Sequence, residues 1–236
     1  MNKNILDRID EIAPYIWARV AGLLYLMVYI LGVFANFIIR EGLIDREDAT
    51  KTANNILDNE LLFRISIVSD LIMATCWALM SLALYMLFKS VNKNIASLMV
   101  ALFLIGVPIM MLNNVNLVAV VLLLNSADYL TVFNDNELNA LVLLFLDLHQ
   151  YGYLISAVFT SFCLLPLGYL VLKSDNFPGF LGVLLIIGSI LGLIDHFVYI
   201  LFPSYEDLSM IVMLPLVIAE LATCFFLLLK GAKKFE

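Results

Sequence analysis

The residues with the clearest chemical potential are two histidines that lie close to carboxylates in apolar stretches of the chain. His149 is two residues from Asp147, and His196 directly follows Asp195; the chain has no other histidine. An imidazole with a carboxylate nearby can act as a general acid or base. It can also ligate zinc or haem iron. The two positions therefore raise an acid–base, a metal and a haem hypothesis.

The remaining spacing argues against a metal or another cofactor. No His-x-x-x-His or His-Glu-x-x-His pattern is present. Helical rise separates the two histidines by roughly 10 Å in depth if they lie on neighbouring helices. Cys76, Cys163 and Cys224 lie in apolar runs without metal-ligand spacing. We therefore expect no metal and no cofactor, with the histidines as structural or pocket groups.

The stretches that carry these residues are long enough to cross a lipid bilayer. Of 236 residues, 63% are hydrophobic and 14% charged, whereas a soluble domain is about half apolar and a quarter charged. A span needs about 20 mainly apolar residues. The candidates are 16–39, 61–88, 95–124, 138–172, 180–202 and 208–229. The sequence thus predicts an all-α, polytopic transmembrane bundle of about six helices, forming a single integral membrane domain over 1–236.

Two of these candidates are longer than a plain crossing requires. Residues 95–124 and 138–172 number 30 and 35 from their end points. As helices they would reach roughly 45 and 52 Å, against a hydrocarbon core of about 30 Å. We expect them to tilt, kink or project beyond the bilayer, with Pro108 and Pro166 as kink sites.

Basic residues predict the orientation. With the N-terminus inside, the inner side holds Lys3, Arg8, Arg19, Lys89, Lys93, Lys173, Lys230, Lys233 and Lys234, and the outer side holds Arg40, Arg46, Lys51 and Arg64. The excess inside favours both termini in the cytoplasm and a multi-pass location in the cytoplasmic (inner) membrane. The net charge of −7 argues against nucleic acid as a partner.

The loop after the first span has a helix signal of its own. Asp48 can cap a helix that begins at Ala49, and Ala53 and Ile56 follow at helical spacing. We expect a short amphipathic helix in this first outer loop, lying at the membrane surface and running into the second span.

Polar residues inside the predicted spans gather toward one side. Counted from the cytoplasmic helix ends, Asn36, Asp70, Asn114 and Asp195 lie roughly 24–28 Å deep, His149 roughly 35 Å, and Glu220 about 15 Å. This pattern predicts an outward-facing polar cavity with Glu220 near its floor. The alternative is that each group satisfies its neighbours or reaches the interface separately.

Further candidates follow from helical spacing. One face of the first span carries a glycine–tyrosine stripe made of Gly22, Tyr25, Tyr29, Gly32 and Asn36. This stripe would line a pocket or form a close helix contact with phenols hydrogen-bonded across it. Arg64 could pair with an acid on another helix, or with Glu60 four residues earlier. The candidate pocket residues are Tyr29, Asn36, Arg64, Asp70, Asn114, Asp147, His149, Tyr153, Asp195 and Glu220. Gly188 and Gly192 form a small-xxx-small pair suited to close helix packing.

Several short motifs together resemble a known family. They are Ala18-Arg19-Val20-Ala21-Gly22, Thr52-Ala53-Asn54-Asn55-Ile56, Phe63-Arg64, Asp70-Leu71, Leu148-His149-Gln150-Tyr151-Gly152-Tyr153, Leu181-Gly182-Val183-Leu184-Leu185 and Asp195. In their order and spacing the chain resembles bacterial multi-span proteins of domain-of-unknown-function family 4386. The resemblance implies six spans, no established activity, and a shared pattern that includes Arg64, Asp70, His149 and Asp195. It also marks His196 as a local feature, since the family pattern has a small polar residue there.

Three functional hypotheses stay open. The first is binding or transport of a small solute, with Asp70, Asp195 and Glu220 as groups that could titrate. The second, less favoured, is an intramembrane enzyme that uses His149 and nearby carboxylates. The third is a non-catalytic structural, immunity or stress-related membrane protein. The partners expected are membrane lipid, a small-molecule ligand and, as a further option, a second copy of the chain.

Overall fold

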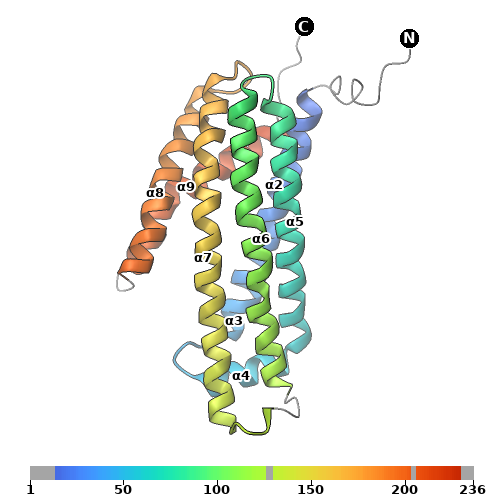
Figure 1. The fold of residues 1–236 in the computed structure, drawn as a ribbon, viewed down its shortest axis with the longest axis vertical. Coiled ribbons are helices and arrows are strands. Elements are labelled where there is room, and N and C mark those ends of the chain that lie inside the picture. Colours follow the sequence, from blue (N-terminus) through green and yellow to red (C-terminus); the bar gives the residue numbers. More distant parts are fainter. Residues whose placement is uncertain (1–13, 126–129, 203–205, 230–236) are drawn as a thin grey trace, which may run out of the picture. The chain divides into compact units, whose positions relative to one another are not determined.

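The computed structural model describes residues 14–125, 130–202 and 206–229, and no strand occurs among them. Its elements, in chain order in Figure 1, are α2 (Pro14–Val33), the π-helix η1 (Phe34–Arg40), α3 (Glu41–Leu43), α4 (Ala49–Asp58), α5 (Glu60–Phe88), α6 (Lys93–Leu124), α7 (Asp135–Lys173), α8 (Gly179–Leu201) and α9 (Glu206–Leu229). The predicted all-α class is confirmed.

Six helical segments among the described residues are long and apolar enough to cross a membrane. They are Pro14–Leu43, Glu60–Phe88, Lys93–Leu124, Asp135–Lys173, Gly179–Leu201 and Val212–Leu229. Each corresponds to one of the six predicted spans, so the multi-pass class is confirmed. The long third and fourth spans are single helices of 32 and 39 residues that contain Pro108 and Pro166.

The first span is longer than the apolar run predicted, and its end is not a loop. The π-helix η1 and the short α3 continue α2 as far as Leu43. Arg40 therefore lies within the first span, 5% exposed, and not beyond the end predicted at residue 39. The prediction ended the first span at Ile39, because an arginine next to Glu41 is typical of the start of a polar loop.

The helix predicted after the first span is present as α4. The Asp48 side chain caps it by accepting a hydrogen bond from the Lys51 backbone N–H at 2.9 Å. Its face with Ala53 and Ile56 is buried. It does not run directly into the second span, because the non-helical Asn59 separates it from α5.

The chain divides into two compact units. Unit 1 contains Met1–Leu26, Trp77–Ile105 and Ala157–Glu236, and unit 2 contains Met27–Cys76 and Gly106–Ser156. The boundary between the units divides each of the long helices α2, α5, α6 and α7, so that one segment belongs to unit 1 and the other to unit 2. The prediction of a single integral membrane domain stays a prediction.

Unit 2 has its own apolar core beneath α4. Residues from six elements form it: Ile39, Leu43, Ile56, Phe63, Ile67, Leu117, Val120, Val121, Leu123, Val142 and Leu146. Asn139 of α7 donates to the Thr50 hydroxyl of α4 at 3.3 Å, which joins the two helices. Figure 1 shows α4 lying across the ends of its neighbours in this unit. The core holds η1 and α5 in fixed register.

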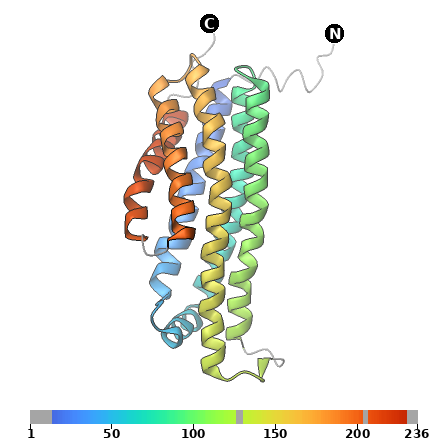
Figure 2. The same cartoon turned by 60° about the vertical axis from the view of Figure 1, so that its left-hand side comes forward.

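Unit 1 is held together by close contacts at glycines. A Cβ added at Gly188 would lie 2.8 Å from the Leu216 Cα, and one at Gly192 would lie 2.8 Å from the Leu216 side chain. The predicted small-xxx-small pair thus packs α8 against α9, which Figure 2 shows side by side. Gly22 likewise meets the Leu228 backbone of α9, where a Cβ would lie 2.8 Å from its nitrogen.

The orientation stays a prediction. Lys3, Arg8, Lys230, Lys233 and Lys234 of the basic-residue count lie outside the described residues.

Candidate functional site

A buried ion pair between η1 and α5 is the centre of the candidate site. The Arg40 guanidinium donates to both carboxylate oxygens of Asp70, at 2.7 and 3.1 Å. It also donates to the Asn36 Oδ1 at 2.6 Å and reaches the Ser66 hydroxyl at 3.3 Å. The side chains of Arg40 and Asp70 are only 6% and 4% exposed. Two-point binding of this kind fixes the orientation of the pair.

The π-helix brings Arg40 to this position. The Glu41 backbone N–H donates to the Asn36 carbonyl, five residues back, instead of four as in an α-helix. Both Ile39 and Arg40 are buried as a result, although they are adjacent in sequence. Ile39 enters the apolar core of unit 2 while Arg40 meets Asp70. Such π segments occur often at functional sites.

A second polar group in unit 2 joins α6 to α7. The Asn113 Nδ2 donates to the His149 backbone carbonyl at 2.7 Å and lies 3.1 Å from His149 Nδ1. Gly152 makes room for this amide, since a Cβ there would lie 2.0 Å from Asn113 Oδ1. Asn116 donates to that same oxygen at 3.0 Å. His149 is thereby held at a fixed position inside the fourth span.

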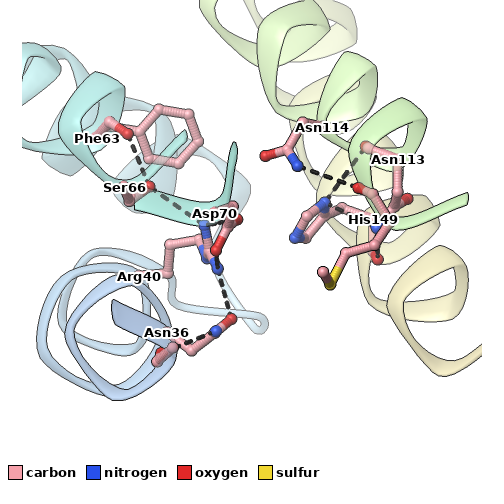
Figure 3. A network of polar contacts seen from close by, with 10 residues as sticks. Asn36, Arg40, Phe63, Ser66, Asp70, Asn113, Asn114 and His149 are labelled. Atoms are coloured by element: carbon pink, nitrogen blue, oxygen red, sulfur yellow. Dashed lines mark hydrogen bonds and ion pairs between the residues drawn. The ribbon is translucent and has the colours of Figure 1, made fainter. Parts of the chain in front are cut away.

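The two groups face each other, and together they form what we call the polar cluster. Figure 3 shows Arg40 and Asp70 on one side and Asn114 and His149 on the other, their polar atoms turned toward one another. The Asn114 Nδ2 donates to the Met110 carbonyl at 3.1 Å. The cluster comprises Asn36, Arg40, Ser66, Asp70, Asn113, Asn114 and His149.

The polar cluster keeps unused hydrogen-bonding capacity. The Asn114 Oδ1 is buried and has no partner among the described residues. His149 Nε2 also has no described hydrogen-bond partner, and His149 as a whole is 8% exposed. His149 Nδ1 lies 3.1 Å from Asn113 Nδ2 and 3.4 Å from the Asn113 backbone carbonyl. In the tautomer in which Nδ1 accepts the shorter of these contacts, the proton is on Nε2. The cluster then offers one acceptor and one donor, and a buried polar atom without a partner is costly.

Four predicted candidates of unit 2 lie outside the polar cluster. Arg64 is exposed and pairs with Glu60 at 2.6 Å, the simpler of the two partnerships considered. Asp147 is exposed and pairs with Arg46. Tyr153 is 41% exposed on α7, and Tyr29 is partly buried on α2.

Asp195 and Glu220 belong to unit 1. Glu220 accepts a hydrogen bond from the Tyr25 hydroxyl at 2.8 Å, which joins α9 to α2. This is the phenol contact across a close helix packing that the glycine–tyrosine stripe suggested. Asp195 is buried, 7% exposed, beside His196. The ten candidates therefore divide between the units.

Ser161, His196 and Asp195 have the residue types of a hydrolase triad without its geometry. The Ser161 hydroxyl lies 3.1 Å from His196 Nε2. The other ring nitrogen, Nδ1, is 3.9 Å from the Asp195 carboxylate, beyond hydrogen-bond distance, and is unsatisfied among the described residues. A triad needs the acid bonded to that nitrogen. The contact instead joins α7 to α8.

The sequence signal found part of the polar cluster. Asn36, Asp70, Asn114 and His149 stood out as polar residues in apolar runs, whereas Arg40 and Asn113 were missed. Asn113 lay beside Asn114 and could have been found as the neighbour on the face toward α7. Among the described residues, no group of three or more His, Cys, Asp or Glu is placed to hold a metal ion.

The helices and the buried pair define a multi-pass membrane protein with a polar cluster inside its spans. The chain belongs to the family described as Domain of unknown function (DUF4386), whose model matches residues 20–231. No curated protein and no solved structure matches the chain significantly.

Proposed function

We propose that this protein binds a small, neutral polar solute at the polar cluster of unit 2, in the cytoplasmic membrane of a bacterium and from its outer side. The observation that carries the proposal is the buried Asn114 Oδ1, which has no partner among the described residues. An unsatisfied buried acceptor destabilises the protein unless a ligand or water satisfies it. A solute with a donor group would supply that bond.

The charges of the polar cluster support a neutral solute. Arg40 and Asp70 compensate each other through two hydrogen bonds, so the pair carries no net charge. An anion or cation entering the spans would leave one charge uncompensated, which is expensive in a membrane. Asn114 Oδ1 would accept from the solute and His149 Nε2 would donate to it. A hydroxyl or a carboxamide group meets both requirements.

The enzyme alternative has weaker support. The enzyme hypothesis combines His149 with nearby carboxylates for general acid–base catalysis. Its described hydrogen bonds go to Asn113, while Asp70 is engaged by Arg40 and Asp147 by Arg46. A fixed, compensated cluster suits recognition of a solute more than proton transfer. Binding is therefore the function that the geometry favours.

The test is a thermal-stability screen of the purified protein in detergent with polyols, sugars, carboxamides and amino acids as probes. Each solute that raises the midpoint of wild type is then measured with Asn114→Leu. We expect the variant to lose the stabilisation, because a leucine offers no acceptor. Loss of one buried hydrogen bond costs about 1–3 kcal/mol, which is about 5- to 150-fold in affinity.

The matched control is Asn54→Leu, the same change at an exposed position of α4. It should bind as wild type does. The proposal fails if no neutral solute stabilises the protein, or if Asn114→Leu and Asn54→Leu respond alike.

A further inference from the structure

Unit 1 contains a pocket at the ends of its helices, and no residue of the polar cluster lines it. It has a volume of about 530 Å³ and is formed where α5 passes into α6 and where α7 passes into α8. Its apolar lining includes Leu87, Val91, Tyr169 and Phe177. Leu87 and Tyr169 lie near the ends of two membrane spans. The pocket therefore begins where the chain leaves the apolar region.

The charged lining consists of one cation and one anion. Lys173 is the last residue of α7, and Asp175 follows two residues later. Both side chains are exposed, and within the described part of the chain neither forms an ion pair, with the other or elsewhere. Two opposite charges that face one pocket without pairing are complementary to a ligand that itself carries both signs.

The uncharged polar lining supplies further hydrogen-bonding groups. Ser90 and Asn92 come from the loop after α5, and Ser174 and Asn176 from the loop after α7. Hydroxyl and amide donors beside a lysine are suited to phosphate oxygens. A lysine among hydrogen-bonding groups at helix ends resembles the basic pockets between transmembrane helices that bind lipid headgroups. The apolar side chains of the same pocket would contact the glycerol and the first acyl carbons.

We infer that this pocket binds the headgroup of a zwitterionic phospholipid, with the phosphate at Lys173 and the ammonium at Asp175. The shared chemistry is a phosphate group, which a lipid or free inorganic phosphate could bring. The aminoalkyl group distinguishes the lipid, because only a zwitterion uses Asp175. Binding here is independent of the solute proposed for the polar cluster.

The test is native mass spectrometry of the full chain in detergent, titrated with phosphatidylethanolamine, phosphatidylglycerol, diacylglycerol and inorganic phosphate. We expect phosphatidylethanolamine to bind most tightly and diacylglycerol most weakly. Lys173→Gln should weaken phosphatidylethanolamine by about tenfold or more, the loss of one charge-assisted hydrogen bond. Asp175→Asn should remove the preference for phosphatidylethanolamine over phosphatidylglycerol.

The control is Lys93→Gln, which makes the same change of charge at an exposed residue outside the pocket lining. It should leave all four affinities unchanged. The inference is overturned if Lys173→Gln and Lys93→Gln behave alike, or if diacylglycerol binds as well as phosphatidylethanolamine. It is equally overturned if inorganic phosphate binds with the affinity of the lipid, which would assign the pocket to a free anion.

Discussion

At the scale of single residues, the Arg40–Asp70 pair combines a high desolvation cost with two short hydrogen bonds. Both side chains are almost fully buried, and Asn36 and Ser66 satisfy donors of the guanidinium that Asp70 does not take. A buried pair of this kind is weak evidence for stability by itself. Removal of one partner, however, leaves an uncompensated charge inside the spans.

Arg40→Met or Asp70→Leu alone should therefore lower the free energy of unfolding by about 3–5 kcal/mol. The double variant should be less destabilised than the sum of the two, because it leaves no unpaired charge. Denaturant unfolding in mixed micelles measures all three. The matched control is Arg64→Met with Glu60→Leu, an exposed pair four residues apart. That cycle should couple by about 0.3–0.5 kcal/mol, and equal coupling in both cycles would refute the assignment.

The close contact between Gly152 and Asn113 leads to a second prediction at the scale of single residues. An alanine Cβ would lie 2.0 Å from Asn113 Oδ1 and 2.5 Å from its Cγ, so the amide must move. Gly152→Ala should cost about 1–3 kcal/mol as an overpacked site and weaken solute binding by releasing His149 from Asn113. Unfolding and binding titrations measure both effects. Gly42→Ala, where nothing lies within 4 Å of the added Cβ, should change neither.

At the scale of elements, η1 and α4 determine how the first span meets the second. The π turn places Ile39 in the apolar core and Arg40 in the polar cluster. Capping by Asp48 begins α4. The Asn55 amide fixes α4 to the end of the first span by donating to the Leu43 carbonyl at 3.1 Å. Lys51 adds an exposed contact to Asp45 at 2.9 Å.

The start of α4 should respond to acid. The hydrogen bond from Lys51 holds the pKa of the Asp45 carboxyl below its usual 3.8. Because the pKa of Asp45 is lowered on folding, its contribution is present above about pH 3.8 and is lost as the pH falls through the lowered value. Hydrogen-exchange protection factors of α4 amides should fall in that window. In Asp45→Asn this step should be missing; a step of unchanged size would show that another group causes it.

Some elements followed from sequence and others did not. Composition and the length of the apolar runs predicted the six spans, because a run of about twenty apolar residues is typical of a transmembrane helix. Asp48 predicted α4, and Gly188 with Gly192 predicted a close helix contact. The π-helix was not predicted from the sequence. It allows the adjacent Ile39 and Arg40 to contact different neighbours, and no local sequence pattern indicates that requirement. That miss also removed Arg40 from the predicted site.

At the scale of the whole molecule, the polar residues of the spans fall into separate units with separate partners. Asn36, Asp70, Asn114 and His149 gather in unit 2, whereas Asp195 and Glu220 belong to unit 1. Depth counting placed most of these residues at similar heights, but height along a helix does not say which face meets which neighbour. Tertiary packing decides that, through Gly152 in unit 2 and Gly22 in unit 1.

The most direct measurement of the central claim is a crystal structure of the protein with a stabilising neutral solute from the screen. The account predicts solute density within hydrogen-bond distance of Asn114 Oδ1 and His149 Nε2, with the Arg40–Asp70 pair intact. Density for the solute at any other position, with Asn114 Oδ1 still without a partner, would contradict it.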